Sequence, residues 1–340
     1  MSAEQRAAAI AEWSERLSQA KQRLASYRKA TEYPFNSRPA SEQPDQMYPN
    51  EPVVEDRAMN NGSDETDPSV RIVSSQSRVF LASDEAVIFT IAARDADGKP
   101  LPLTINAARA TGLPGEAGAA GISVAMAFND QGRAGDAQAG DGTLSATLTP
   151  SPGPLASFDG TIRVELAFKA DDKPGQHFFD VVRANTAPAT WAGGFTDTLT
   201  DGSLVLSAPV EVRQAGRYVI HARVDDASGK PVALASFNEQ LEAGAQTVRL
   251  TVFGKLIRDA APRFPLTIRD VDGYLLHEHG HPDRALMPRL AGPVGVTAQY
   301  SLSSFSNAEW QGEQRSRYLA EFGKDLDQAK QALDALKQGG

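Results

Sequence analysis

The sequence predicts a mainly β protein with two immunoglobulin-like antiparallel β-sandwiches, flanked by N- and C-terminal amphipathic helices. Two observations carry this prediction. Short runs of alternating apolar residues, broken by turn residues, fill most of the chain between residues 70 and 302, and such runs are typical of antiparallel sandwiches. At both ends of the chain, apolar residues instead recur every three or four positions, which is the helical period.

The two terminal segments share one apolar spacing. In the N-terminal segment the stripe consists of Ile10, Trp13, Leu17, Ala20, Leu24 and Tyr27. In the C-terminal segment it consists of Leu319, Phe322, Leu326, Ala329, Leu333 and Leu336. Both stripes have the heptad spacing of a coiled coil and are too narrow for a helix that is buried on all sides. Three arrangements stay open: the helices pair with each other antiparallel, each lies on a sandwich face, or the stripes mediate self-association.

These patterns divide the chain into five segments. We expect an N-terminal helix over 1–32, a Pro/Asp-rich linker over 33–68, a first sandwich over 69–186, a second sandwich over 187–305 and a C-terminal helix over 306–340. No apolar period survives in the linker, so we expect it to be extended or partly disordered. The turn DADGKP at 95–100 is echoed by DASGKP at 226–231, which predicts a similar hairpin in each sandwich.

Composition excludes several classes of protein. The 340 residues include no cysteine, which excludes disulfides, thiol catalysis and Cys-ligated zinc. The net charge of −9 argues against binding to nucleic acid or anionic membranes, which need positive potential. No apolar run approaches the ~20 residues of a membrane span, so we expect a chain that is not transmembrane. The HExxH, GxSxG, P-loop and Rossmann motifs of common enzymes are also missing from the sequence.

The location of the protein is a separate expectation. The N-terminal stretch MSAEQRAAAIAEW carries charges where a signal peptide would have its apolar core. We expect the periplasm or the cell surface, with a signal peptide already removed, and the sequence leaves a cytoplasmic location open.

The loop NDQGRAGDAQAGDG at 129–142 is the first candidate site. Its carboxylates, Asp130, Asp136 and Asp141, could together bind calcium, which prefers oxygen ligands. They are five or six positions apart, however, and the regular spacing of an EF-hand is missing. The competing interpretation is a tight turn that aspartates cap and glycines permit. We favour the capped turn and keep calcium as an alternative.

The stretch LLHEHGHPD at 275–283 is the second candidate site. His277, His279 and His281 alternate and could converge on zinc with Asp283 if the segment is an extended strand. Gly280 and Pro282 instead indicate a loop, so a solvated polar loop is the favoured interpretation.

Two tryptophans lie outside the predicted strands. Trp191 is in the connector PATWAGG, and Trp310 is in SNAEWQGE. Either side chain could anchor one domain against another, which we favour, or contact a partner.

Two stretches resemble a known family. The loop at 129–142 and the strand after it resemble bacterial exported proteins with tandem immunoglobulin-like sandwiches, the choice-of-anchor X-like domains of unknown function. The matching loop residues are Asp130, Gly132, Gly135, Asp136, Ala139, Gly140, Asp141 and Gly142, with Leu144 where the family has an aromatic residue. The matching residues of the second sandwich are Gly216, Tyr218, Ala222, Gly229, Pro231, Leu241, Gly244 and Gly254. The resemblance implies an envelope or surface component without assigned catalysis.

We therefore expect a non-catalytic envelope or secreted protein, with a role in interaction or spacing, that needs a protein partner and no cofactor. The alternative is a metal-binding module or metal-dependent enzyme that uses His277, His279 and His281.

Overall fold

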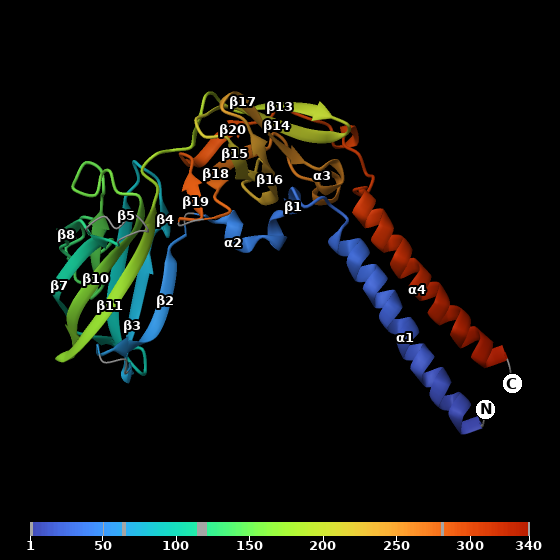
Figure 1. Cartoon of the computed structure of the whole chain (residues 1–340), viewed down its shortest axis with the longest axis horizontal. Coiled ribbons are helices and arrows are strands. Elements are labelled where there is room, and N and C mark those ends of the chain that lie inside the picture. Colours follow the sequence, from blue (N-terminus) through green and yellow to red (C-terminus); the bar gives the residue numbers. More distant parts are fainter. Residues whose placement is uncertain (1–2, 50, 63–65, 114–120, 280–281, 339–340) are drawn as a thin grey trace.

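Figure 1 shows a computed structural model of the chain, which is elongated and has three parts. A first β unit lies at one end, a second β unit lies in the middle, and a pair of long helices projects from the second unit. Both chain ends lie at the free tip of this helix pair. The structure describes residues 3–49, 51–62, 66–113, 121–279 and 282–338. No helix in these ranges is long and apolar enough to cross a membrane.

Helices α1 (Ala3–Ala30) and α4 (Glu313–Gln338) lie side by side and run in opposite directions (Figure 1). The stripe residues of both helices are buried or half-buried, and most residues between them are exposed. Near the second β unit, the ring of Tyr27 is 5.7 Å from that of Tyr318 and 5.2 Å from that of Phe322. Of the three open arrangements, the antiparallel pair is the one that forms, and the arrangement in which each helix lies on a sandwich face is wrong. Self-association stays a prediction.

Residues 33–68, which we expected to be an extended or partly disordered linker, instead contribute to both β units. They form β1 (Ser37–Pro39), the 3-10 helix η1 (Ala40–Glu42), α2 (Pro44–Met47), β2 (Val53–Asn60) and the start of β3 (Thr66–Gln76). Strand β1 pairs with β16 of the second unit, and β2 pairs with β3 of the first. These elements are held by main-chain pairing and a few isolated buried side chains such as Met47 and Met59. Such contacts leave no apolar period in the sequence.

The first β unit contains β2 and β3 together with the strands up to residue 183. The further strands are β4 (Phe80–Leu81), β5 (Val87–Asp95), β6 (Pro100–Leu101), β7 (Leu103–Gly112), β8 (Ser123–Ala125), β9 (Leu144–Leu148), β10 (Gly160–Ala170) and β11 (Lys173–Arg183). Each of the runs that predicted a strand here contains one, because alternating apolar residues fit the pleat.

The first unit was expected to have two separate sheets, but its described strands form one sheet in the order β6-β5-β3-β2-β11-β10-β7-β8, with β4 also on β11 and β9 also on β5. The sheet curls so that its two halves face each other across one core. The ring of Phe89 on β5 lies 4.8 Å from that of Phe179 on β11, which shows the two halves in contact. The halves are joined where β2 meets β11.

The second β unit contains β1 and the elements from residue 189 to 305. These are β12 (Ala189–Trp191), β13 (Thr196–Thr200), β14 (Ser203–Val212), β15 (Gly216–Asp225), β16 (Pro231–Leu241), β17 (Gly244–Val252), α3 (Gly254–Ala260), β18 (Thr267–Leu276), β19 (Arg284–Leu286), β20 (Leu290–Val296) and the 3-10 helix η2 (Leu302–Ser304). One sheet has the order β1-β16-β15-β18-β19, with β20 also on β18, and the other is built around β14. Side chains from both sheets share one core.

Tyr218 marks a corner of this second core. Its hydroxyl lies 2.7 Å from the carbonyl oxygen of Gln214 and 3.0 Å from that of Pro188. Burial of the ring raises the pKa of this hydroxyl to about 12. The side chain therefore ties the start of β15 to the segment that precedes β12.

The two echoed turns have the same hydrogen bonds. The main-chain N–H of Asp95 donates to the carbonyl oxygen of Lys99, and that of Asp226 donates to the carbonyl oxygen of Lys230, both at 2.9 Å. The carboxylate of Asp95 accepts the N–H of Asp97 and Lys99, and that of Asp226 accepts the N–H of Ser228 and Lys230. The predicted similarity of the two hairpin turns is thus confirmed.

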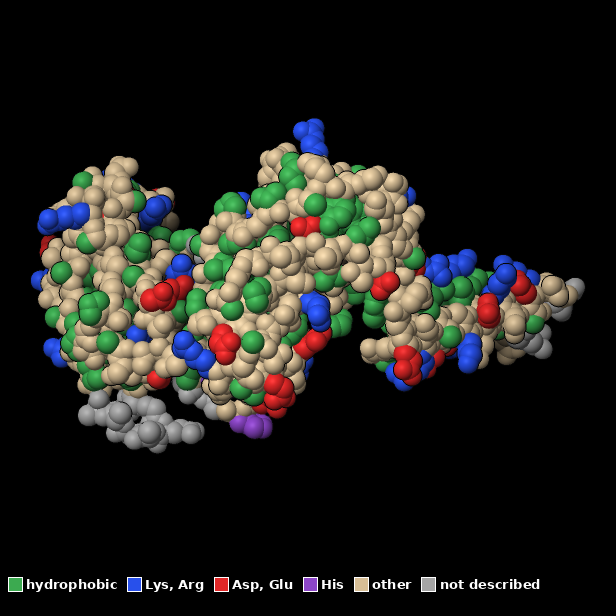
Figure 2. Space-filling view, turned by 90° about the horizontal axis from the view of Figure 1, so that it is seen from above, with side chains coloured by type: hydrophobic (Ala, Val, Ile, Leu, Met, Phe, Trp, Pro, Cys, Tyr) green, Lys and Arg blue, Asp and Glu red, His purple; other side chains and the backbone are tan. Residues whose placement is uncertain are grey.

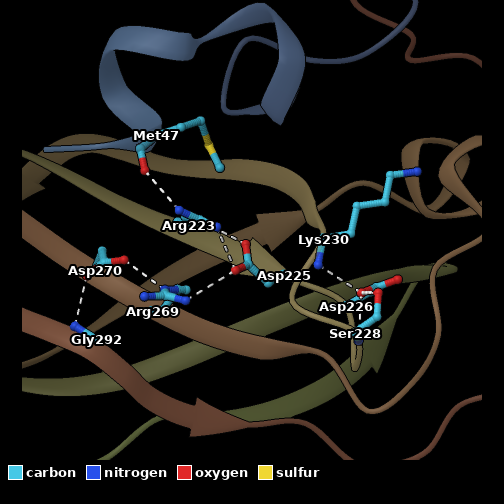
Figure 3. Close-up of polar contacts among 9 residues, drawn as sticks. All are labelled: Met47, Arg223, Asp225, Asp226, Ser228, Lys230, Arg269, Asp270 and Gly292. Atoms are coloured by element: carbon cyan, nitrogen blue, oxygen red, sulfur yellow. Dashed lines mark hydrogen bonds and ion pairs between the residues drawn. The ribbon is translucent and has the colours of Figure 1, made fainter. Parts of the chain in front are cut away.

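A buried ionic network holds α2 on the outer face of the second unit (Figure 3). Arg223 donates two hydrogen bonds to Asp225, at 2.7 and 2.8 Å. It also donates to the carbonyl oxygen of Met47 at the end of α2, at 3.4 Å. Arg269 on β18 lies 3.5 Å from Asp225 and 2.8 Å from Asp270. The network therefore joins the expected linker to two strands of the sheet.

A second charged group lies where the two β units meet. The guanidinium of Arg289 lies 3.2 Å from the carboxylate of Glu85 and donates to the carbonyl oxygen of Phe80 at 3.1 Å. The guanidinium of Arg284 lies 4.3 Å from the ring centre of Phe80, a cation–π contact. These contacts join the β4 region to the segment around β19.

Candidate functional site

The three aspartates of the 129–142 loop come together in the structure. One carboxylate oxygen from each of Asp130, Asp136 and Asp141 lies within 4.8 Å of the others. The fold of the loop thus brings the three carboxylates together, although they are five or six positions apart in the sequence. An all-oxygen set of this kind has the chemistry that calcium prefers, although calcium takes about six to eight ligands.

The same oxygens also hold the loop together. Asp130 accepts the N–H groups of Gly140 and Gly142, at 2.5 and 3.0 Å. Asp136, which is buried, accepts the N–H of Gly132 at 2.5 Å. Gly135 has a φ of 95°, and an added Cβ would lie 2.7 Å from the hydroxyl oxygen of Thr147. These contacts are those of the capped turn that we favoured, and calcium binding stays the untested alternative.

The histidine segment is a turn between β18 and β19. His277 follows the last residue of β18, and its Nδ1 lies 3.1 Å from the carbonyl oxygen of Pro282. The carboxylate of Asp283 lies 2.8 Å from the guanidinium of Arg284. His279 is exposed, and His281 lies outside the described residues. In the described part of the chain, His277, His279 and Asp283 do not form a convergent ligand cluster.

The two tryptophans have different surroundings. The indole N–H of Trp191 donates to the carbonyl oxygen of Pro288 at 2.8 Å, and the ring packs against Phe195 and the core of the second unit. Trp191 therefore anchors two segments of one unit, rather than one unit against another. Trp310 lines a hollow of about 480 Å³ at the base of the helix pair, with Phe35 exposed beside it. Partner contact at Trp310 stays a prediction.

The first β unit contains a cleft that our sequence analysis missed. Among the described residues, β2 and β11 pair only at Asn60 and Gln176 and then separate. The space between them is a cleft of about 600 Å³, lined by β2, β3 and β11. Ile72 and Phe179, two residues of the core cluster, line it. The cleft is therefore an opening in the curled sheet that reaches the edge of the core.

Exposed apolar side chains gather around this cleft. Phe178 is 55% exposed, Val53 46% and Val79 37%, and all three line it. The guanidinium of Arg163 lies 4.3 Å from the centre of the Phe178 ring and covers part of it. Contiguous apolar groups that stay exposed to water are a common feature of interaction surfaces. The adjacent pair Phe178 and Phe179 was the signal in the sequence, because neighbouring residues of a strand point to opposite faces.

The charges at the cleft balance one another. Glu55 pairs with Arg57 and Asp180 pairs with Arg163, each at 2.7 Å. His177 packs its ring 4.6 Å from that of Phe179, and burial lowers the pKa of the imidazole, so the neutral form is favoured near pH 7. A ligand of this cleft would therefore meet apolar and hydrogen-bonding groups with little net charge.

Comparisons with known proteins do not place the chain in a family. No family model and no curated protein matches it. Among solved structures, a DUF4785 family protein from Legionella pneumophila is similar with a TM-score of 0.41 and 12% identity, over 66% of this chain and 57% of that chain. Squid arrestin has a TM-score of 0.23 and 8% identity, over 71% of this chain and 99% of its own. Latent PorU from Porphyromonas gingivalis has a TM-score of 0.19 and 10% identity, over 76% of this chain and 21% of its own.

The chain spans little more than half of the Legionella protein's length, and all three structural likenesses are too low to indicate a function.

Proposed function

We propose that this chain is a non-catalytic binding protein of the bacterial envelope or a secreted one, in which the first β unit contacts a protein partner. The observation that carries the proposal is the cleft between β2 and β11, with Phe178, Val53 and Val79 exposed around it. Exposing such side chains to water costs free energy, which a partner would recover on binding.

The arrangement of the three parts supports a spacing role as well. The cleft lies in the first β unit and the helix pair extends from the far side of the second, so the second unit separates them (Figure 1). In the space-filling view of Figure 2 the two β units form separate lobes, and the helix pair forms a narrow arm with charges of both signs. Within the middle unit, the ionic network around Arg223 and Asp225 ties α2 to two strands of the sheet.

The assignment to immunoglobulin-like sandwiches of the choice-of-anchor X-like type belongs to this proposal. Tyr218 supports it for the second unit, because a buried tyrosine that binds a carbonyl a few residues upstream is a feature of Greek-key sandwiches. An exported location and the absence of catalysis are implied by the same resemblance.

Site-specific photo-crosslinking in cells that produce the protein tests the proposal. Phe178 is replaced by a photoreactive benzoylphenylalanine, which keeps an aromatic ring at the mouth of the cleft. Leu199 on β13 receives the same group as a matched control, since it is also exposed but lies in the second unit. We expect an adduct of defined mass from position 178 and none from position 199. Equal labelling at both positions, or none at 178, would contradict a binding role for the cleft.

A further inference from the structure

The main-chain groups of β11 face the cleft with an alternating pattern. The N–H of Val182 donates to the carbonyl oxygen of Val79 at 2.8 Å, on the side of β11 that faces away from β10. The carbonyl oxygen of Asp180 accepts a hydrogen bond from the Gln76 side chain at 3.1 Å on that same side. Because alternate residues of a strand direct both main-chain groups to the same edge, the N–H and C=O of Phe178 also point into the cleft.

Strand pairing is therefore interrupted inside the sheet. Strand β11 is paired with β2 at Gln176 and with β4 at Val182 and Arg183, and the described residues provide no strand partner between these points. An interruption of this length corresponds to about 17 Å of extended chain. Unpaired main-chain groups at a strand edge are a template for another strand.

We propose that the cleft takes an extended peptide segment of a partner protein, which pairs as an added strand with β11 between Gln176 and Val182. This inference rests on the binding role proposed above and specifies the chemistry of the partner. Main-chain hydrogen bonds supply the pairing, and side-chain contacts select the sequence, as in other cases of strand addition.

The side chains around the cleft define the peptide further. One face of the added strand would contact Ile72 and Phe179 at the edge of the core, and the other would contact Phe178. The charged residues at the cleft are already paired with each other, so they do not select a charged ligand. The peptide segment that fits this cleft is therefore short, uncharged at its centre and apolar at alternate positions. The helices α1 and α4 project away from the cleft (Figure 1), so neither of them supplies the added strand.

Peptide selection followed by N-methylation tests the proposal. The full-length protein is used to select from a phage-displayed library of random nine-residue peptides, with the Phe178→Glu variant as the counter-selection target. The selected peptide is then synthesised in two forms, N-methylated at odd or at even positions, which removes the N–H groups of one edge at a time. The free acceptor that β11 offers a peptide N–H is the carbonyl oxygen of Phe178, because that of Asp180 already accepts from Gln76. Loss of this one main-chain hydrogen bond weakens binding about fivefold.

We expect at least one N-methylated form to lose affinity by this factor, and the amide exchange of Phe178 and Asp180 to slow when the unmodified peptide binds. Leu199→Glu serves as the control variant and should bind the peptide like the wild type. Retained affinity in both N-methylated forms would overturn strand addition and leave the proposed binding role standing. If the wild-type protein and Phe178→Glu select the same peptides, a peptide partner is excluded. The crosslinking at position 178 then decides whether the cleft binds another kind of partner.

Discussion

Arg223 and Asp225 lie two residues apart on β15 and bind each other through both carboxylate oxygens, at 2.7 and 2.8 Å, with Asp225 only 1% exposed. Arg269 approaches the same carboxylate, and Arg223 reaches the end of α2. A buried carboxylate between two guanidinium groups cannot be removed without leaving uncompensated positive charge.

We therefore predict that Asp225→Ala lowers the free energy of unfolding by about 3 to 5 kcal/mol. Urea denaturation at neutral pH measures the change. The control is Asp56→Ala, which removes the partner of Arg71 from an exposed pair. Exposed pairs contribute less than about 1 kcal/mol. Similar losses in the two variants would contradict the structural role of the buried network.

The buried imidazole of His177 makes stability depend on pH. Its pKa in the folded protein lies below the ordinary 6.5 because burial disfavours the charged form. Protonation thus favours the unfolded chain, so this residue's contribution is present above pH 6.5 and is lost as the pH falls below that value. We predict that His177→Gln flattens the dependence of unfolding free energy on pH between about 6.5 and 5. Equal slopes in the wild type and in His177→Gln would contradict the prediction.

The helix pair depends on the apolar stripe of α4. Leu333 is 5% exposed in that stripe, and a charge there would be buried against α1. We predict that Leu333→Asp melts much of the pair and lowers the helical circular-dichroism signal. Burying a charge in a packed contact lowers the free energy of unfolding by about 3 kcal/mol or more. Lys330→Asp, on the exposed side of α4, should keep the signal. A wild-type spectrum for Leu333→Asp would show that the pair does not rely on this stripe.

The aspartate loop is predicted to hold its shape through its own hydrogen bonds. Because Asp136 is buried and accepts the N–H of Gly132, we expect Asp136→Asn to lower stability by about 1 to 3 kcal/mol. We also expect the wild-type melting temperature to be the same in calcium chloride and in EDTA. A rise in calcium that Asp130→Asn abolishes would instead assign a calcium site to the loop.

The histidine turn is predicted to bind no metal at stoichiometric level. The ring of His277 already contacts the carbonyl of Pro282, and Asp283 is paired with Arg284. Protein purified without a metal-affinity column should contain well below one zinc per chain by mass spectrometry of the metals. One zinc per chain in the wild type, lost in a His279→Ala/His281→Ala double variant, would establish the rival metal-binding function.

Much of the local structure follows from short patterns in the amino-acid sequence. The heptad stripes predicted both helices, because helical period and stripe width are local properties, and they left open which surface each stripe contacts. The turns at Asp95 and Asp226 were predictable because one aspartate carboxylate caps each turn. Most strands were predictable as well, since side chains alternate between the faces of a sheet.

Which strands pair with each other depends on the folded chain as a whole. Strands β1 and β2 have no apolar alternation, and they form because β16 and β3 offer main-chain partners. The curl of the first sheet brings β2 to β11 at Asn60 and Gln176 and lets them part, which creates the cleft. Likewise, Asp130, Asp136 and Asp141 converge only when their loop closes. Pairing between distant segments depends on the geometry of the whole chain, and no local pattern of residues encodes it.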